Sequence, residues 1–501
     1  MKATDVTVQD FIGGLKKAFI IPPYQRNYAW GEDQCREFYD DIMRCVETGG
    51  NHYIGNVVYY LGENSGGAFQ EMILVDGQQR ITTILLLLCA LRDITDDEDL
   101  EGDIDEQYLC NKRANEVYRI RLKQTVSDGE SFTAIIDGAD TQDMSCNVAK
   151  NYRFFRKKLL SYSGELSAVL DAVARMQLVD VNLQIASDTK DSLRIVQTIF
   201  EKINSTGKPL SQADLIRNYL LIAPSDEKQS KWHKDYWLKI ERNLGVDNIS
   251  AFSRDFLRMT DCEEIRENDT YREFKNYVSK DMQDDQELVL KTLLRFSKSY
   301  SWLINLDCPD EELNRELTML RNLKSNDFAP LALYLLDRLY DIALSELRLI
   351  IHLIVDYLLR MRIASPTTGS GTTRSLSFEL IRKMRDDGEN SIACSYDAIL
   401  FELSNSPTIA SEFPSDERFI AALQGIFYHL YARELLLRVE EYETKNIPVD
   451  ISKVTVEHLM PRTISDWWKQ NLGGNEEAER IRLTYTNPSS FCRIGQRCWL
   501  V

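Results

Sequence analysis

The chain has 501 residues and a formal net charge of −18, with 44% hydrophobic and 28% charged residues, a composition typical of a soluble globular protein of several domains. The acidic excess excludes a protein that coats DNA without specificity, because such binding requires many Lys and Arg residues against the phosphates. The most apolar stretch, Leu347 to Met361, is interrupted by charged residues such as Arg348 and Asp356, which excludes a membrane span.

Ten cysteines are spread along the chain without a CxxC pair, and the polar N-terminus does not resemble a signal peptide. These features predict a reduced, cytoplasmic protein with neither a disulfide framework nor a zinc ribbon. We expect no membrane partner, and the sequence leaves the oligomeric state open.

Residues 1–221 are predicted to form an α+β domain, because apolar runs of strand and helix periodicity alternate along them. The expected strands are Met72 to Val75, Tyr118 to Leu122 and Leu178 to Ile185, and the expected helices are Ile81 to Leu91 and Ser192 to Ile203.

Residues 222–441 are predicted to form an all-α domain. Leu317 to Tyr340 and Leu344 to Met361 carry apolar residues at three- and four-residue spacing. The stretch from Ser365 to Thr373 consists almost entirely of Ser, Thr, Gly and Pro, and is expected to be a flexible linker.

Residues 442–501 are predicted to form a third domain, in which the hydrophobic period changes. Val454 to Leu459 is expected to be a strand, ended by Pro461. From Ile451 to Val501 there are seven Lys or Arg residues against five Asp or Glu residues. This part of the chain is therefore more compatible with DNA than the acidic remainder.

The first motif is IPPYQRNYAW at residues 21–30. Its two prolines stiffen the backbone and present Gln25 and Arg26 beside aromatic rings. A guanidinium on a rigid segment suits phosphate recognition, because it can donate two parallel hydrogen bonds. The alternative is a proline-anchored aromatic corner whose arginine caps a helix, and local chemistry alone favours that alternative.

The second motif is VDGQQRITT at residues 75–83, between an expected strand and an expected helix. Free backbone N–H groups and the helix dipole favour phosphate at such a place. Gly77 would permit close approach of the backbone, Gln78, Gln79 and Arg80 would offer donors, and Asp76 could hold a metal ion or orient a water. The alternative is a buried, hydrogen-bonded turn without a ligand.

The third motif spans residues 200–218, where Gly207 is expected at a helix end and Ser211 at the N-cap of the next helix. Gly207 and Lys208 do not form a phosphate-binding P-loop, because Lys202 and Pro209 stand where that motif needs Gly and Ser or Thr. A well-capped helix–turn–helix is an adequate local explanation.

The fourth motif is EHLMP at residues 457–461. A Glu–His pair at the end of a strand could supply a metal-ligand carboxylate and a general base, provided that the strand bends there, because neighbouring strand residues face opposite sides. The proline at the end of the motif makes such a bend plausible. An ordinary histidine remains the simpler interpretation of His458.

Taken together, these segments and the HYIG sequence at residues 52–55 resemble, in chain order, the GmrSD-type modification-dependent restriction endonucleases. The resemblance implies an N-terminal domain of the ParB/sulfiredoxin-like fold and a C-terminal HNH domain of the ββα-metal type. It implies that the protein binds and hydrolyses a nucleotide, with Asp76 as a catalytic residue. The implied nucleotide-binding residues are Tyr24, Gln25, Arg26, Asp76, Gly77, Gln78, Gln79 and Arg80. The implied cofactors are a nucleoside triphosphate and Mg²⁺ or a similar divalent metal.

In the HNH part, the resemblance assigns metal binding to Glu457 and the general base to His458. The family pattern continues to a Gly-Asn-Leu turn, which this sequence lacks, since Asn487 is followed by Pro488. We therefore expect a truncated nuclease unit with an incomplete site. The expected function is nucleotide-dependent recognition and cleavage of modified DNA in anti-phage defence. The alternatives are an NTPase or regulatory DNA-binding protein without cleavage, and a nucleic-acid sensor without turnover.

Overall fold

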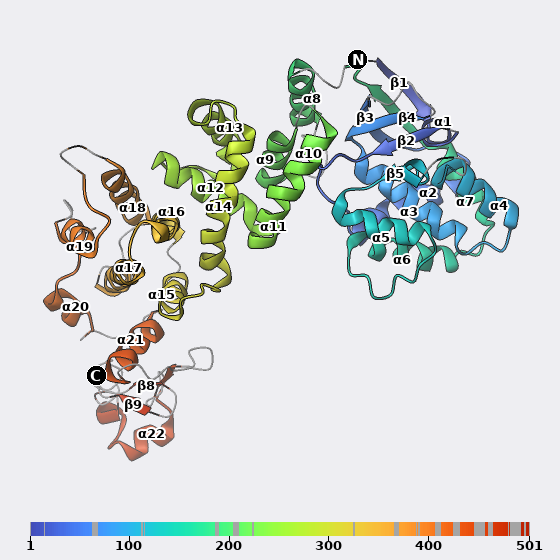
Figure 1. The fold of residues 1–501 in the computed structure, drawn as a ribbon. Coiled ribbons are helices and arrows are strands. Elements are labelled where there is room, and N and C mark those ends of the chain that lie inside the picture. The colour runs from blue at the N-terminus through green and yellow to red at the C-terminus, as the bar shows by residue number, and fades with distance from the viewer. Residues whose placement is uncertain are drawn as a thin grey trace. The chain divides into compact units, whose positions relative to one another are not determined.

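The computed structural model of the chain describes residues 2–14, 16–62, 69–111, 114, 116–185, 190–203, 210–222, 225–323, 326–364, 370–386, 388, 391–405, 412–423, 431–444, 456–458, 464–478, 480, 492–494 and 497–499. The chain divides into two compact units: unit 1 is Met1–Lys239 with Val278–Leu290, and unit 2 is Ile240–Tyr277 with Lys291–Val501. Figure 1 shows the ribbon of both.

Unit 1 is built on a six-stranded mixed sheet of order β1-β6-β3-β4-β2-β5. Its strands are β1 (Lys2–Thr7), β2 (Lys17–Ile20), β3 (Tyr53–Leu61), β4 (Gln70–Asp76), β5 (Leu122–Lys123) and β6 (Gln177–Asn182). β3 and β4 are antiparallel, whereas β2 runs parallel to β4 and β6 parallel to β3. Residues 71–75 of β4 are all buried, as expected for a strand that is covered on both faces.

The helices of unit 1 include one, α3 (Gln78–Arg92), that is mostly apolar and buried along most of its length. They are α1 (Val8–Ile12), α2 (Glu32–Thr48), α3 (Gln78–Arg92), α4 (Glu98–Ile104), η2 (Asp105–Leu109), η3 (Glu116–Tyr118), α5 (Val126–Ile136), α6 (Asn147–Leu160), α7 (Leu166–Arg175), α8 (Lys190–Ile203), α9 (Gln212–Leu221), α10 (Asp226–Trp232) and η5 (His233–Trp237). Every residue of α3 from Ile81 to Leu91 is buried, because the helix is apolar on all sides. Figure 1 shows α2, α3, α5, α6 and α7 gathered on one side of the sheet.

The remainder of the described chain is mostly helical. Its elements are α11 (Leu238–Leu244), η6 (Val246–Asn248), α12 (Ile249–Asp261), η7 (Glu267–Asp269), α13 (Thr270–Asp281), α14 (Gln286–Asn305), α15 (Glu311–Asn322), η8 (Asn326–Phe328), α16 (Ala329–Asp337), η9 (Arg338–Tyr340), α17 (Leu344–Ala364), α18 (Ser370–Arg385), α19 (Tyr396–Ser404), α20 (Asp416–Leu423), α21 (Ala432–Thr444), β7 (Val456–His458), α22 (Asp466–Asn471), β8 (Cys492–Ile494) and β9 (Arg497–Trp499). The last three strands form an antiparallel sheet of order β7-β8-β9. Among the described residues, no helix combines the length and the apolar character that crossing a membrane requires.

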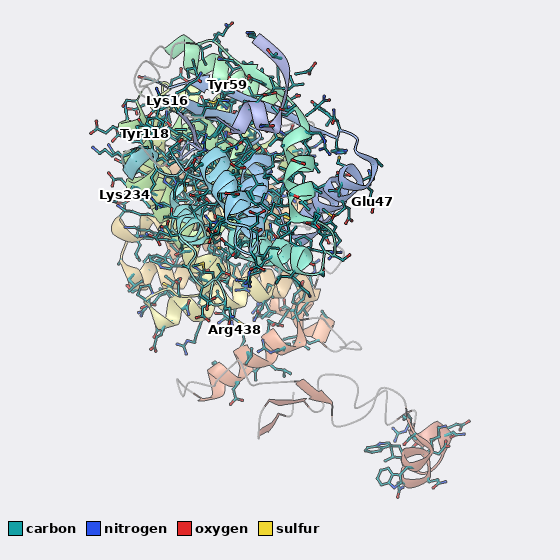
Figure 2. All side chains as sticks on the ribbon, turned by 90° about the vertical axis from the view of Figure 1, so that its right-hand side faces the viewer. Lys16, Glu47, Tyr59, Tyr118, Lys234 and Arg438 are labelled. Atoms are coloured by element: carbon teal, nitrogen blue, oxygen red, sulfur yellow. The ribbon has the colours of Figure 1, made fainter. Side chains whose placement is uncertain are left out.

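The α+β character of the N-terminal part and the helical character of the remainder are confirmed, and most predicted elements lie where they were expected. The strand predicted over Tyr118 to Leu122 is wrong for most of its length, since only Leu122 belongs to β5. Within this segment the side chain of Arg121 is buried and donates to the carbonyls of Gly14 and Glu106. Tyr118, labelled in Figure 2, instead donates its hydroxyl to Glu71 at 2.5 Å.

The helical character predicted for Leu317 to Tyr340 is confirmed in its described residues by α15, η8, α16 and η9, and Pro330 stands in the first turn of α16. One prediction for the helical part needs correction. The linker predicted over Ser365 to Thr373 is wrong at its end: α18 begins at Ser370, and Arg374 in its second turn donates to Asp327 at 2.8 and 2.9 Å. Residues 365–369 lie outside the described residues. The domain boundaries at 221 and 441 stay predictions.

Candidate functional site

The aromatic segment 21–30 lies against the first turn of α3, and glutamine side chains hold the two together. Gln79 accepts the N–H of Ala29 at 2.7 Å and that of Trp30 at 3.2 Å, and donates to the carbonyl of Asn27 at 3.3 Å. Gln78 donates to the carbonyl of Arg26 at 3.2 Å. The first and second motifs therefore form one local structure, although about 50 residues separate them in the chain.

A third glutamine fixes the start of the same segment. Gln25 is 4% exposed and donates to the carbonyl of Val75, the second-last residue of β4, at 2.9 Å. The neighbouring side chain of Tyr24 is also buried. These amide groups satisfy backbone that would otherwise be buried without partners in an irregular segment.

Two glycines let β3 approach this turn closely. Gly77 has a φ of +93°, and a Cβ atom there would lie 2.9 Å from Val57 Cγ2. Gly55, at φ +98°, lies beneath the guanidinium of Arg80, where a Cβ atom would be 3.0 Å from Cζ. Both positions require glycine for conformation and for space. The packing of Gly77 against β3 thus requires glycine at this position, and the close approach of a ligand stays a prediction.

The charged groups around the first turn of α3 remain partly exposed. The side chains of Asp76 and Arg80 are 22% and 25% exposed, and the atoms Oδ2 of Asp76 and Nη1 of Arg80 are 4.0 Å apart. Arg80 also donates to the carbonyl of Asn56. Arg26 is part-buried, and its guanidinium has no hydrogen-bond or ion-pair partner among the described residues.

The helix start itself has no cap. Gly77 occupies the N-cap position and has no side chain with which to cap it. The backbone N–H groups of Gln78, Gln79 and Arg80 find no acceptor in the described part of the chain, as is usual for the first turn of an uncapped helix. Such N–H groups and the helix dipole attract an anion.

The third motif also contacts the aromatic segment, through a buried arginine. Arg217 of α9 is 4% exposed and donates to the carbonyl of Pro23 through Nε at 3.2 Å and Nη2 at 3.0 Å. Its Nη2 also lies 3.1 Å from Nε2 of the buried His233. Burial first, and then the charge of Arg217, lower the pKa of His233 to about 4. His233 is therefore neutral at pH 7 and can accept this hydrogen bond.

A buried aspartate completes the support of the aromatic segment. Asp128 of α5 accepts the backbone N–H of Tyr28 at 2.6 Å, and burial raises the pKa of its carboxyl. The hydroxyl of Tyr28 lies 2.7 Å from that of Thr83 and accepts from Asn151 at 3.2 Å. Tyr28 thus bridges α3 and α6 beneath the exposed charges.

The structure brings the eight residues predicted for nucleotide binding into one region and separates them by role. Tyr24, Gln25, Gln78 and Gln79 are buried and Gly77 packs on β3, whereas Arg26, Asp76 and Arg80 reach solvent. Sequence reasoning missed the support from Asp128, Asn151 and His233, which stand outside any motif. Arg217 and Gly55 lay within recognised segments, but nothing local indicated what they contact.

The predicted nuclease residues belong to unit 2. Glu457 and His458 lie on β7, opposite Arg493 and Cys492 of β8, so the predicted strand is confirmed over residues 456–458. Gly207 and Asn487 lie outside the described residues. The described part of the chain contains no group of three or more His, Cys, Asp or Glu side chains arranged to hold a metal ion.

A strand–turn–helix junction that presents two arginines, one aspartate and an uncapped helix start defines a candidate anion-binding domain. Residues 8–221 match the family described as the GmrSD restriction endonuclease, N-terminal domain. Residues 8–221 therefore form a domain of the GmrSD N-terminal type, as the resemblance implied for this part of the chain. The matched range includes the aromatic segment 21–30, β3, the DGQQR segment and Arg217. No curated protein matches the chain.

Proposed function

We propose that this protein is a DNA restriction enzyme of anti-phage defence that binds and hydrolyses a nucleoside triphosphate at the start of α3 and acts on modified DNA. The observation that carries the nucleotide proposal is the placement of Arg26, Asp76 and Arg80 around an uncapped helix start. The family match supports DNA as the partner.

The residues present fit a phosphate chain. The free N–H groups of the first turn of α3 bind phosphate oxygens, and Arg26 and Arg80 neutralise their charge. Asp76 is the only carboxylate of the two motifs in this part of the structure. It can hold Mg²⁺ as a single protein ligand, because this ion keeps several waters and takes the rest of its shell from substrate phosphates.

In the proposed hydrolysis, a water attacks the terminal phosphorus and the bond to the bridging oxygen breaks. Asp76 accepts a hydrogen bond from this water and orients it. Arg26 and Arg80 donate to the oxygens on which negative charge develops. The glutamines hold the arginine-bearing segment in place and take no part in the chemistry.

For the nuclease unit, whose site we expect to be incomplete in this chain, we propose that Glu457 would bind a divalent metal and that His458 would be the general base that removes the proton from the attacking water. The metal supplies charge stabilisation at the scissile phosphate. The support for these roles is the Glu-His-x-x-Pro sequence and its position on β7.

The test of the nucleotide proposal is steady-state hydrolysis of ATP and GTP by the full chain. We expect Asp76→Ala and Arg80→Ala to lower turnover by at least about 100-fold, the scale of a lost positioning or charge-stabilising group, with an almost unchanged thermal transition. Arg26→Lys keeps the charge but loses the guanidinium fork, so it should weaken nucleotide affinity. The matched controls are Asp33→Ala and Arg36→Ala on the surface of α2, which should have no effect. Wild-type hydrolysis by both site variants would refute the assignment.

The test of the DNA proposal is cleavage of modified and unmodified DNA in the presence of Mg²⁺ and nucleotide. If His458 is the base, His458→Ala abolishes cutting while nucleotide hydrolysis persists. Nucleotide hydrolysis without cleavage of any DNA would favour the second candidate, an NTPase or regulatory DNA-binding protein. The nucleotide-site residues belong to unit 1 and the predicted nuclease residues to unit 2, which is also compatible with this candidate. Undiminished cutting by His458→Ala would remove the nuclease assignment.

A further inference from the structure

The helix α6 carries only positive charges, although the chain as a whole is strongly acidic. Its 14 residues include no Asp or Glu, whereas the chain has 78 Asp and Glu residues against 60 Lys and Arg residues. Figure 1 shows α6 at the side of unit 1 that is away from the sheet. The cations of α6 are Lys150, Arg153, Arg156, Lys157 and Lys158.

The outermost cations of α6 are not neutralised within the protein. Lys150, Arg156 and Lys157 are exposed, and no hydrogen bond or ion pair joins their side chains to another residue in the described part of the chain. The neighbouring helix α2 differs, since its Arg36 pairs with Glu32 at 2.7 Å. Unpaired cations on one face of an acidic protein create a local positive potential that attracts an anionic partner.

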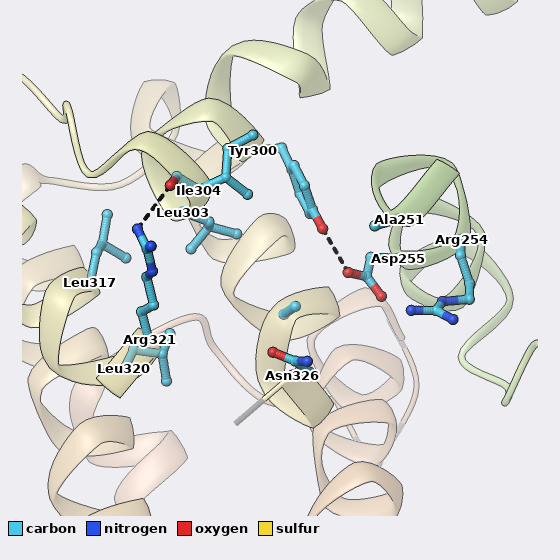
Figure 3. A pocket seen from close by; sticks show the side chains of 11 residues that line it. Ala251, Arg254, Asp255, Tyr300, Leu303, Ile304, Leu317, Leu320, Arg321 and Asn326 are labelled. Carbon is cyan, nitrogen blue, oxygen red and sulfur yellow. Dashed lines mark hydrogen bonds between the residues drawn. The ribbon is translucent and has the colours of Figure 1, made fainter. Parts of the chain in front are cut away.

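The arginines around the cavity of unit 2 are, by comparison, engaged by the protein itself. Arg321 donates to the carbonyl of Ile304 at 3.0 Å (Figure 3). The guanidinium of Arg254 lies 3.8 Å from the carboxylate of Glu267. The charge of α6 is therefore not a general property of the arginines in this chain.

The inner face of α6 is fixed to the rest of unit 1. Asn151 donates to the carbonyl of Trp30, the last residue of the aromatic segment, at 2.8 Å. Tyr152 donates to the carboxylate of Asp93, which follows α3, at 2.7 Å. These contacts lie on the buried side of the helix, so they hold its outward face in place. Replacing the exposed cations leaves these contacts intact.

The spacing of the cations fits a chain of phosphates. Lys150, Arg153 and Lys157 follow one another at three and four residues, which places them on one side of the helix. From Lys150 to Lys157 the helix rises about 10 Å, the length of about three nucleotides on one strand of B-DNA. Arg153 also donates to the carbonyl of Met144 at 3.0 Å, and thereby anchors the loop before α6.

We propose that the outward face of α6 binds the phosphate backbone of double-stranded DNA without reading its sequence. The inference rests on the proposed function for the identity of the polyanion as DNA. It places a DNA contact in unit 1, whereas the predicted nuclease residues belong to unit 2. Lys and Arg side chains on phosphates fix the position of a protein on DNA and carry no sequence information. The acidic remainder of the chain repels DNA and so directs it to a basic face.

The test is titration of the full chain with a fluorescent duplex of about 30 base pairs at several salt concentrations, in EDTA so that no metal-dependent cutting occurs. The α6 variant combines Lys150→Gln, Arg156→Gln and Lys157→Gln. It loses three phosphate contacts, so we expect at least about tenfold weaker binding at low salt. The slope of log affinity against log salt should become shallower by about two to three.

Two further variants separate charge at α6 from charge in general. The combination of Lys150→Arg, Arg156→Lys and Lys157→Arg keeps the three charges and should bind as the wild type does. The matched control removes three exposed cations of α13 and α14 and changes the net charge equally. It combines Arg272→Gln, Lys280→Gln and Lys298→Gln, and should keep the wild-type salt slope.

Nucleotide hydrolysis and the thermal transition, measured on the same preparations, distinguish a failure at α6 from a failure of the proposed function. If the wild type binds DNA and the α6 variant binds it equally, or if the control loses as much affinity, the α6 assignment is overturned and the proposed function stands. If the wild type hydrolyses nucleotide but binds no DNA, the α6 assignment and DNA as the partner are both overturned. Preferred binding of single-stranded RNA or of anionic vesicles, lost in the α6 variant, would replace DNA by another polyanion and overturn the proposal.

Discussion

The two units use buried polar side chains in different ways. In unit 1, the amides of Gln25, Gln78 and Gln79 hold backbone groups of an irregular segment, and leave charged groups free at its surface. In unit 2, ion pairs join one helix to another: Glu316 of α15 is 2.5 Å from Arg438 of α21 and 2.9 Å from His352 of α17.

The two kinds of side chain stabilise different kinds of contact in the two units. A loop packed on a helix start has unpaired backbone groups, which neutral amides satisfy at little electrostatic cost. Helices satisfy their own backbone, so only their faces need joining, and charged side chains can do this where the helices meet. Unit 1 should therefore respond to the loss of an amide, and unit 2 to the loss of a charge.

The largest effect is expected for Gln79→Ala, which tests whether side-chain amides stabilise unit 1. It removes the side chain that accepts from the N–H groups of Ala29 and Trp30 and donates to the carbonyl of Asn27, so we expect unit 1 to lose about 3 kcal/mol of unfolding free energy. Chemical denaturation with a probe in unit 1 measures the loss. Gln107→Ala, which removes only a 3.3 Å surface contact to Asp103, is the control. Equal, small effects of both variants would contradict the scaffold role of Gln79.

The corresponding variant in unit 2 is Glu316→Ala. It removes the partner that Arg438 (labelled in Figure 2) and His352 share, although Asp356 still pairs with both. We expect a loss of about 2 kcal/mol, less than for a fully buried pair because one carboxylate remains. Hydrogen exchange in α15 and α21 should rise while α3 stays protected. Equal deprotection of α3 would show that the effect is not local.

Two histidines, the buried His233 and the partly exposed His352, should give the units opposite pH dependence. The pKa of His233 is lowered from 6.5 to about 4, so its contribution to unit 1 is complete above pH 6.5 and is lost as the pH falls toward 4. Hydrogen bonds to Asp356 and Glu316 raise the pKa of His352 to about 9, so its contribution to unit 2 is complete below pH 6.5 and is lost as the pH rises through 9.

Hydrogen exchange of the full chain between pH 5 and 9, resolved by unit and corrected for intrinsic rates, measures this contrast. His233→Gln keeps an acceptor for Arg217 and should flatten the acid slope of unit 1. His352→Gln should flatten the alkaline slope of unit 2. If both units weaken in the same direction of pH, the two histidines do not govern the contrast.

The smallest expected effect concerns a surface pair of unit 1. Arg36 and Glu32 are 2.7 Å apart on α2, but both side chains are about half exposed or more. Arg36→Ala should change the stability of unit 1 by no more than about 0.5 kcal/mol. A loss comparable to that of Glu316→Ala would mean that exposure does not separate the two kinds of ion pair.

The sequence determined the elements whose residues carry a local signal. The apolar run of α3 specifies a buried helix, and the alternation in β6 specifies a strand. Ser211 caps α9 as predicted, because its hydroxyl accepts the N–H of Asp214 at 3.1 Å. The order of the family motifs indicated the family. These features depend on neighbours in the chain, so the sequence is enough to predict them.

The tertiary structure decided the roles of the polar residues. Gln78 and Gln79 donate to the aromatic segment, a contact that the sequence did not indicate, and their predicted role in nucleotide binding stays a prediction. Arg121 is buried because it donates to backbone carbonyls such as that of Glu106, and Arg217 contacts Pro23, 194 residues away. The role of a buried polar side chain depends on its hydrogen-bond partner. When that partner lies far away in the sequence, the local pattern of residues does not predict it.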